Sequence, residues 1–183
     1  MQSNKTDTAS CSVIKVRGLH KNFGPREILR GINLDVRAGD ILSVMGPSGS
    51  GKSTLLYCMA GILAADKGEV FFNGKNLAHY SANSLIALRK TSFGFIFQFG
   101  ELISELPVRD NIALPLLLRG VRKKQAYKTA DEWASLVGVQ NVISALPHTL
   151  SGGEMQRTAI ARAMAINPEV IFSQMNQRDL WIQ

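Results

Sequence analysis

The sequence predicts an α/β fold built around a phosphate-binding loop, and three observations support this prediction. Residues 46–54 read Gly-Pro-Ser-Gly-Ser-Gly-Lys-Ser-Thr and lie between an apolar run and a helix-compatible run, 41–45 and 55–60. Strand-like segments gather in the first half of the chain, and helical periodicity dominates much of the second half. The chain then returns to a helix and an apolar strand, 151–166 and 170–172. These elements indicate an α/β core with an inserted helical subdomain.

Five segments before residue 98 have the alternation or apolar composition of strands: 13–19, 28–36, 41–45, 69–72 and 93–97. The apolar residues of 28–36 share one face only if Gly31 marks a bulge or turn. Residues 41–45 predict a buried strand that runs directly into the Gly-rich loop, and Asn73-Gly74 predicts the end of 69–72.

Helices are predicted from about Lys52 and over four further segments: 81–90, 114–118, 126–137 and 151–166. Ser81 can cap the helix 81–90, whose apolar face would hold Leu85, Ile86 and Leu88. Pro107, Pro115 and Pro147 are expected to interrupt the helical region. The strands and helices together predict a sheet followed by a helical insert.

The Gly-rich loop has the residue types that phosphate binding requires. Its glycines let successive backbone N–H groups turn toward phosphate oxygens, and the following helix adds its positive end. Lys52 would reach the β- and γ-phosphates, and the Ser53 hydroxyl would hold Mg²⁺. The predicted ATP-binding residues are Gly46, Ser48, Gly49, Ser50, Gly51, Lys52, Ser53 and Thr54. A flexible Gly/Ser linker is the alternative interpretation, and the strand–helix context argues against it.

Composition bounds the class of protein. The chain has 183 residues, 45% hydrophobic residues and a formal net charge of +7, which fits one globular domain. No apolar run reaches the length of a membrane span, and residues 1–12 lack the apolar centre of a secretory signal, so a disordered leader is expected. Cys11 and Cys58 have no metal or redox spacing, and Cys58 is expected to be a buried thiol in a reduced cytoplasmic compartment.

Positive charge concentrates in one cluster: Arg119, Arg122, Lys123, Lys124 and Lys128. The spacing fits the exposed start of a helix, and Tyr127 is the only aromatic residue in the run. A solvated face is the simplest interpretation, contact with anionic lipid or a partner is the second, and nucleic acid is the third.

A second anion-binding motif opens the helix 151–166, where the chain reads Leu150-Ser151-Gly152-Gly153-Glu154. A helix start with exposed amides and a small hydroxyl can hold an anion. Glycine near a helix start is common, so this motif is weak alone. It is strong together with the Gly-rich loop, about a hundred residues earlier.

From these motifs the chain resembles the ATP-binding subunits of ATP-binding-cassette (ABC) transporters over residues 13–172. It is most similar to the lipoprotein-releasing and macrolide-export group, through 46–56, Phe97-Gln98, 106–112 and 150–164. The resemblance implies a P-loop NTPase core of the ABC type, with an N-terminal antiparallel β subdomain and a helical subdomain over about 99–166 that docks on the permease.

The resemblance also implies roles for single residues. Phe23 matches the aromatic residue that stacks on adenine, although it would also suit a strand-end core position. Gln98 matches the Q-loop glutamine that touches Mg²⁺ or the lytic water, although it would also suit a surface position. Residues 150–154 match the signature motif that contacts ATP held by a second subunit, which implies a dimer around two ATP molecules. The expected partners are therefore a membrane permease and a second ATP-binding subunit, homodimeric or heterodimeric, at the inner face of the membrane, with no nucleic acid.

The chain departs from the family pattern after Phe172. The family continues this strand with Asp and then Glu, which hold the Mg²⁺ shell and polarise the attacking water, whereas this chain has Gln174 and Met175. Family features beyond this strand, including the switch histidine and the last strands, are not found. His20, His79 and His148 lie upstream and are expected to be surface residues. The expectation is a truncated, poorly soluble chain that binds nucleotide without useful hydrolysis.

A shift of reading frame would account for residues 173–183. One permitted DNA spelling of this tail, read one base earlier in phase, encodes Ala-Asp-Glu-Pro-Thr-Gly-Ser-Leu-Asp-Ser, which is the family's own continuation. The hypothesis is that the tail is a frame-shifted reading, which makes a pseudogene product one alternative. A non-catalytic nucleotide-binding regulatory module is a second alternative. A DNA-repair or chromosome-associated ATPase is a third, which the short helical insert disfavours.

Overall fold

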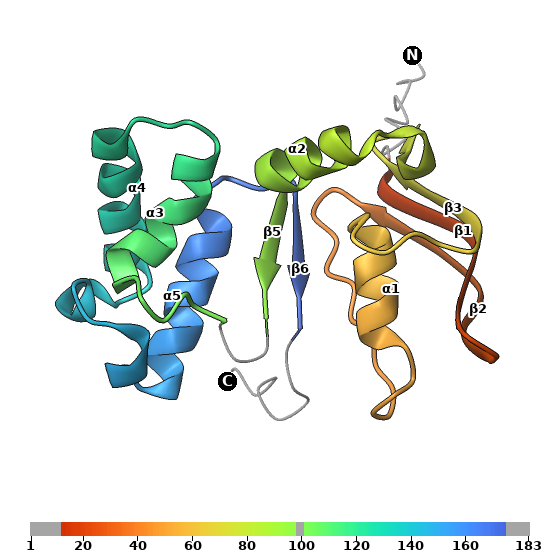
Figure 1. Cartoon of the computed structure of the whole chain (residues 1–183), viewed down its shortest axis with the longest axis horizontal. Coiled ribbons are helices and arrows are strands. Elements are labelled where there is room, and N and C mark those ends of the chain that lie inside the picture. The colour runs from red at the N-terminus through yellow and green to blue at the C-terminus, as the bar shows by residue number, and fades with distance from the viewer. Residues whose placement is uncertain (1–11, 98–100, 175–183) are drawn as a thin grey trace, which may run out of the picture. The chain divides into compact units, whose positions relative to one another are not determined.

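A computed structural model of the chain describes residues 12–97 and 101–174, and the chain divides into two compact units, residues 1–85 and 86–183 (Figure 1). The predicted leader 1–12 lies outside the described residues except for Ser12, which already belongs to the first strand. The tail beyond Gln174 also lies outside them. Each unit is described by itself.

An antiparallel sheet organises unit 1. Its strands are β1 (Ser12–Phe23), β2 (Arg26–Arg37), β3 (Lys67–Phe72) and β4 (Lys75–Asn76), in the order β2-β1-β3-β4. Val16 of β1 lies opposite Leu34 on one side and Val70 on the other. Alternate residues of β1, Ile14 and Val16, are almost fully buried. The predicted strands 13–19, 28–36 and 69–72 are therefore confirmed.

The predicted bulge at Gly31 is also confirmed. Between the pairs Leu19–Ile32 and Lys21–Leu29, β2 contains one residue more than β1. Gly31, which lies in this stretch of β2, has a left-handed φ of 69°. The extra residue moves the inward position from Ile28 to Leu29, so Leu29 is buried and Ile28 only half-buried. The sequence predicts the bulge, but it does not predict that the bulge turns Leu29 toward the core.

A second bulge lies where β1 meets β3. Gly18 has a φ of 53°, and Gly68 at the start of β3 has a φ of 86°. A Cβ atom built on Gly68 would lie 2.2 Å from the carbonyl oxygen of Gly18 and 2.5 Å from that of Arg17. The two backbones can approach this closely only because residue 68 has no side chain.

Segment 41–45 is not the buried strand that the sequence predicts. It has no regular structure, and Ile41 is 96% exposed. In the described part of the chain no strand pairs with it. Since a strand needs a hydrogen-bonding neighbour, apolar composition alone does not form one here. The helix that follows the Gly-rich loop is present as α1 (Lys52–Met59), which buries Leu55, Cys58 and Met59.

Unit 2 combines a two-stranded parallel sheet with three packed helices. β5 (Phe93–Ile96) pairs with β6 (Val170–Ser173). The helices are α3 (Val108–Leu118), α4 (Lys123–Leu136) and α5 (Gly152–Met164), with short 3₁₀ turns η2 (Gln140–Val142) and η3 (Pro147–Thr149). Alanines 126, 130 and 134 form the buried face of α4. Pro115 lies inside α3 and does not end it, in contrast to the prediction.

Helix α2 (Ala82–Ser92) contains the boundary between the units, and the 3₁₀ turn η1 (Leu77–His79) precedes it. Ser81 caps α2 as predicted, because its Oγ accepts a hydrogen bond from the Ser84 N–H at 3.2 Å. Ile86 was expected on the apolar face but is exposed. Among the described residues, the longest helix has 14 residues, and none is long and apolar enough to cross a bilayer.

The contact between Gly68 and β1 gives a direct test of unit 1. We expect Gly68→Ala to destabilise the β1–β3 pairing by about 2–4 kcal/mol, through the clash and the left-handed backbone. Hydrogen–deuterium exchange of β1 and β3 amides measures this loss. The matched control is Gly74→Ala, because Gly74 has a similar φ of 76° but open space around it. If both variants exchange equally fast, the steric argument is wrong.

Candidate functional site

The Gly-rich loop of unit 1 is an open turn that leads into α1. The Ser50 N–H donates to the Pro47 carbonyl at 3.3 Å, and the Leu55 N–H donates to the Gly51 carbonyl at 2.9 Å. Ser48, Gly49 and Ser50 are exposed, and so is Ser53 on the first turn of the helix. The first turn of α1 contains no acidic side chain, so its positive end is available to an anion.

Gly51 holds the end of this loop against the sheet. It has a φ of 92°, and a Cβ atom on it would lie 2.7 Å from Cγ2 of Ile28 and 3.3 Å from the Ile28 carbonyl oxygen. Glycine is therefore required for two reasons, the left-handed backbone and the close approach of β2. The loop position immediately before Lys52 is fixed by the neighbouring strand.

The Lys52 ammonium group lies over the loop itself. Its Nζ donates to the carbonyl oxygens of Gly46 at 2.8 Å and Pro47 at 2.7 Å. These two contacts hold a positive charge at the centre of the turn. Phosphate oxygens are stronger acceptors than backbone carbonyls, so an incoming phosphate can replace them. Thr54, the last residue of the motif, is half-buried on α1.

Phe23 ends β1 and is 53% exposed, which leaves a ring face available to a planar ligand. Nζ of Lys21 lies 5.9 Å from the ring centroid. Lys21 also donates to Asp66 at 2.8 Å, and this bond, with a second from the Asn22 N–H, holds the pKa of the Asp66 carboxyl below its usual value. Lys21 and Asp66 therefore support the strand end next to the predicted adenine platform.

The second motif opens α5 in unit 2 with a complete capping box. The Glu154 N–H donates to Ser151 Oγ at 3.3 Å, and the Ser151 N–H donates to Glu154 Oε2 at 2.8 Å. Leu150 is buried and anchors this turn. Gly152 and Gly153 are exposed, and a Cβ atom on Gly152 would meet nothing within 4 Å. Within residues 12–97 and 101–174, nothing requires glycine at position 152.

The capping box sets the charge of the motif. The Ser151 hydroxyl donates to Glu154 Oε2 at 2.6 Å. Hydrogen bonds from the Ser151 side chain and backbone lower the pKa of Glu154, and these outweigh partial desolvation. Glu154 is therefore ionised at neutral pH, and its carboxylate occupies the donors of Ser151 when no ligand is bound.

The third predicted region lies at the carboxyl ends of β5 and β6. Gln98, which follows β5, lies outside the described residues, and so does Met175. The Gln174 N–H donates to the Ile96 carbonyl at 2.8 Å, so the parallel ladder extends to residue 174. Gln174 thus stands directly after β6, in which Phe172 is buried and Ile171 is exposed, and it carries an amide where the family resemblance implies a carboxylate.

Sequence reasoning missed the role of Asn111, the most buried polar side chain of α3. Its Oδ1 accepts from the Ile103 N–H at 2.8 Å, while its Nδ2 donates to the carbonyls of Ile103 and Leu106 at 3.0 and 2.7 Å. One amide thus fixes the loop before α3. The available signal was an amide residue inside an apolar helical stretch, which must find partners if it is buried.

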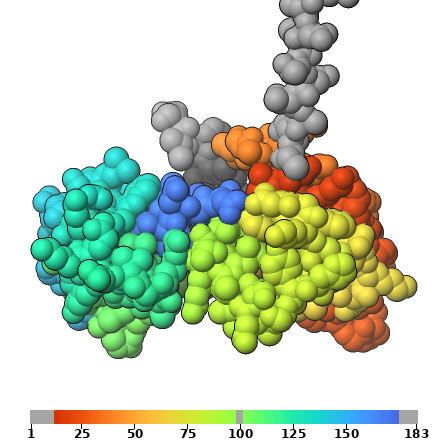
Figure 2. Space-filling model, turned by 90° about the horizontal axis from the view of Figure 1, so that it is seen from above, coloured from red at the N-terminus to blue at the C-terminus, as the bar shows by residue number. Residues whose placement is uncertain are grey.

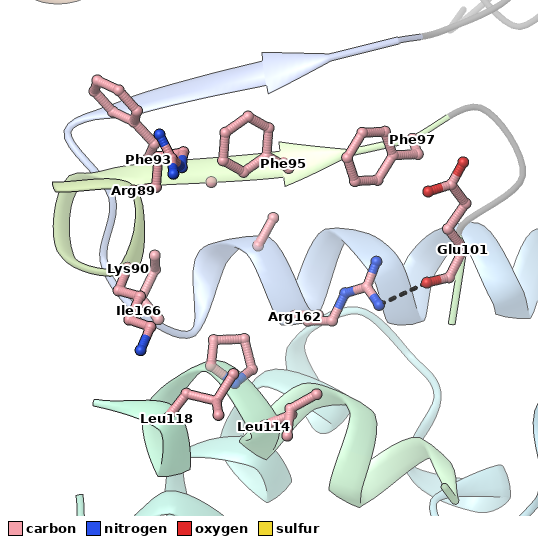
Figure 3. Close-up of a pocket in the computed structure, with 13 residues that line it drawn as sticks. Arg89, Lys90, Phe93, Phe95, Phe97, Glu101, Leu114, Leu118, Arg162 and Ile166 are labelled. Atoms are coloured by element: carbon pink, nitrogen blue, oxygen red, sulfur yellow. Dashed lines mark hydrogen bonds between the residues drawn. The ribbon is translucent and has the colours of Figure 1, made fainter. Parts of the chain in front are cut away.

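An apolar cavity of about 270 Å³ lies in unit 2 between β5 and α3 (Figure 3). Phe95, Phe97, Leu114 and Leu118 form part of its wall, and Arg89, Lys90 and Arg162 contribute cationic groups. The Arg162 guanidinium donates to the Glu101 carbonyl oxygen at 2.8 Å and so ties α5 to the loop before α3. The cavity is therefore largely apolar, and its lining also holds three cationic side chains and one acidic residue, Glu101.

The residues present fit ATP phosphates better than they fit a complete Mg²⁺ shell. The loop offers a lysine charge, exposed backbone around three small residues and the start of a helix. Toward Mg²⁺ the motif supplies the Ser53 hydroxyl. Among the described residues no group of three or more His, Cys, Asp or Glu side chains could hold a metal ion. Cys58 is buried, which raises the pKa of its thiol, as expected for a core cysteine.

Comparisons with known proteins agree with these features. The profile of the family described as "ABC transporter" matches residues 29–173. The lipoprotein-releasing system ATP-binding protein LolD of Bacteroides thetaiotaomicron is 38% identical over 161 residues, which cover 88% of this chain and 74% of the relative. The methionine import ATP-binding protein MetN of Rhizobium johnstonii is 39% identical over 173 residues. That match covers 94% of this chain but 48% of MetN.

Solved structures show the same fold. The ATP-binding cassette MJ0796, described as a dimer in a post-hydrolysis state with ADP and Pi, has a TM-score of 0.80 and 30% identity. The match covers 90% of this chain and 77% of that one. CbiO1 of Clostridium perfringens, described as part of a cbiONQ transporter complex, has a TM-score of 0.77 and 27% identity, over 88% of this chain and 64% of that one.

The capping box predicts how residue 154 titrates. We expect the carboxyl pKa of Glu154, measured by NMR, to lie below its ordinary value of 4.5. The lowered pKa means that the stabilisation of the α5 start is present at neutral pH and is lost as pH falls through the folded-state pKa. Ser151→Ala should return the pKa toward 4.5, whereas Thr149→Ala, two residues earlier, should not. An unchanged pKa in Ser151→Ala would disprove the assignment.

Proposed function

The chain belongs to the ABC transporter family, and we propose that it is the ATP-binding subunit of a transporter, binding ATP and Mg²⁺ but lacking efficient hydrolysis. The observation that carries the proposal is the pairing of two helix-opening motifs in one chain. The Gly-rich loop opens α1 with Lys52 at its centre, and residues 150–154 open α5. The similarity to LolD and MetN points to import or lipoprotein release as the kind of work performed.

ATP would bind through residues of unit 1. Lys52 would leave the carbonyls of Gly46 and Pro47 and take the β- and γ-phosphates, while the loop amides and the α1 start bind the remaining oxygens. Ser53 would hold Mg²⁺, together with Gln98. The exposed ring of Phe23 would stack on the adenine.

The open surface at Gly152 supports assembly with a second subunit. A residue that has no internal reason to be glycine is suited to a close approach from outside the chain. We propose that Ser151, Gly152 and Gly153 contact the γ-phosphate of ATP bound by the other subunit of a homodimer or heterodimer. The dimeric structures of the relative MJ0796 support this arrangement.

Loss of hydrolysis follows from residues 174 and 175. Gln174 cannot supply the negative charge of a metal-shell carboxylate, and Met175 cannot act as a general base. The tail 173–183 is proposed to be a shifted reading of the family sequence, in which Asp and Glu would stand at these places. Should the tail be genuine, a non-catalytic module that pairs with an intact subunit is the second candidate, and the same two residues favour it.

A permease segment would dock on unit 2. The cavity between β5 and α3 has aromatic and aliphatic walls with Arg89, Lys90, Arg162 and Glu101 among its lining, which suits one or two apolar side chains that project from a permease helix (Figure 3). The proposed location is therefore peripheral, at the cytoplasmic face of a membrane, without a role for nucleic acid.

Nucleotide binding tests the first part of the proposal. We expect Lys52→Ala to weaken the binding of a fluorescent ATP analogue by about 10- to 100-fold, because charge-assisted hydrogen bonds to phosphate are lost. Lys67→Ala removes an exposed lysine from β3 and should change affinity little. Equal affinities of the wild type and Lys52→Ala, or no binding by the wild type, would contradict the proposal.

Hydrolysis and gene sequence test the second part. We expect the purified chain to turn over ATP about 10² to 10⁴ times more slowly than an intact family member in the same coupled assay, because the general base is missing. Resequencing the gene through codon 171 and beyond the end of the tail checks the cause. A shifted frame that continues with family sequence supports a misread copy, and family-like turnover by the chain as written refutes the deficiency.

A further inference from the structure

The turn between α3 and α4 carries the densest positive charge of the chain. Residues 111–130 contain five cations and no Asp or Glu, although the whole chain has a net charge of only +7. The cations are Arg119, Arg122, Lys123, Lys124 and Lys128. In Figure 2 the surface of this region, coloured green to teal, lies open to the viewer.

Several of these charges are not used within the chain. In the described part of the structure, Arg122 and Lys124 are exposed and form no ion pair. Arg122 immediately precedes α4, whose first turn contains no acidic residue and whose start has no side-chain cap. The partial positive charge at the start of a helix repels nearby cations, so this arrangement is unfavourable without an external anion.

An exposed apolar side chain lies beside the cations. Leu118, the last residue of α3, is 58% exposed and adjoins Arg119. Val121 within the turn is half-buried. A leucine followed in sequence by arginines and lysines matches the interfacial region of a membrane, where the apolar group enters the acyl boundary and the cations meet headgroup phosphates.

Single-stranded nucleic acid fits this surface less well. Base binding by an unspecific basic surface uses exposed aromatic rings, and Tyr127 is the only aromatic residue in 111–130. The Tyr127 hydroxyl donates to Asp110, while Arg109 and Lys123 lie 5.6 and 5.1 Å from its ring centroid. The ring is therefore already occupied.

We propose that the α3–α4 turn, residues 118–124, binds anionic lipid headgroups and holds unit 2 against the membrane surface. The proposal deepens the proposed function, since an ATP-binding subunit of a transporter works beside a bilayer. Leu118 also lines the apolar cavity, and its exposed part would enter the interface, while Arg122 and Lys124 would contact lipid phosphates. The remaining cations would add a long-range attraction that salt screens.

Vesicle flotation of the full chain tests the proposal, because aggregated protein sinks and does not count as bound. The probes are vesicles of phosphatidylcholine alone and vesicles in which one third is phosphatidylglycerol. We expect binding only to the anionic vesicles. Removing two cations that each contribute about 1 kcal/mol at an anionic surface should make Arg122→Gln/Lys124→Gln bind roughly thirtyfold more weakly. Both side chains are exposed, so the fold should be preserved.

The matched control is Arg37→Gln/Lys75→Gln, which removes the same charge from exposed positions in unit 1. It should weaken binding no more than about threefold if position matters. Equal weakening by both double variants, equal binding to neutral vesicles, or tighter binding to duplex DNA than to anionic vesicles at the same salt would overturn the proposal. Nucleotide affinity measured on the same proteins decides the proposed function separately, because none of the substituted residues lies in the ATP site.

Discussion

The hydrogen-bond requirement of a β-strand governs how the nucleotide loop is held. An extended segment is stable only when neighbouring strands satisfy its N–H and C=O groups. Segment 41–45 has the apolar composition of a central strand but no partner within the described residues, and it remains an exposed coil. Within the described part of unit 1, the Gly-rich loop is therefore supported at its far end, by α1 and by the contact of Gly51 with Ile28.

This one-sided support explains the position of Lys52. With residues 46 and 47 at the end of an unpaired coil, the ammonium group bonds to their carbonyl oxygens and closes the turn on itself. The ammonium charge therefore stays at the centre of the loop, but it is bonded to the loop's own carbonyl oxygens. A phosphate must displace those bonds, and holding 41–47 in one conformation costs backbone entropy that no strand partner among the described residues offsets. Any neighbour that pairs with 41–45 would lower that cost and so raise nucleotide affinity, by linkage.

Local signals were predictable from the sequence, and contacts between distant segments were not. The bulge at Gly31, the cap at Ser81 and the motif opening α5 each follow from residues close in sequence. The strand 41–45 failed because its existence depends on a partner elsewhere, which composition cannot supply. The bonds of Asn111 reach only eight and five residues back along the chain, to Ile103 and Leu106, but apolar periodicity gave no weight to an amide.

The residues proposed to bind ATP are present, whereas the carboxylates that would support its hydrolysis are not, and this difference bears on the proposed function. The phosphate loop and residues 150–154 are complete, and Gly152 is open to an approach from outside the chain. Gln174, whose N–H donates to the Ile96 carbonyl, lies where the family resemblance implies a carboxylate. ATP bound between such a subunit and an intact one would contribute its binding energy to the contact without being consumed. The pair would then stay closed at this site for as long as nucleotide remains bound, while hydrolysis proceeds at the intact site.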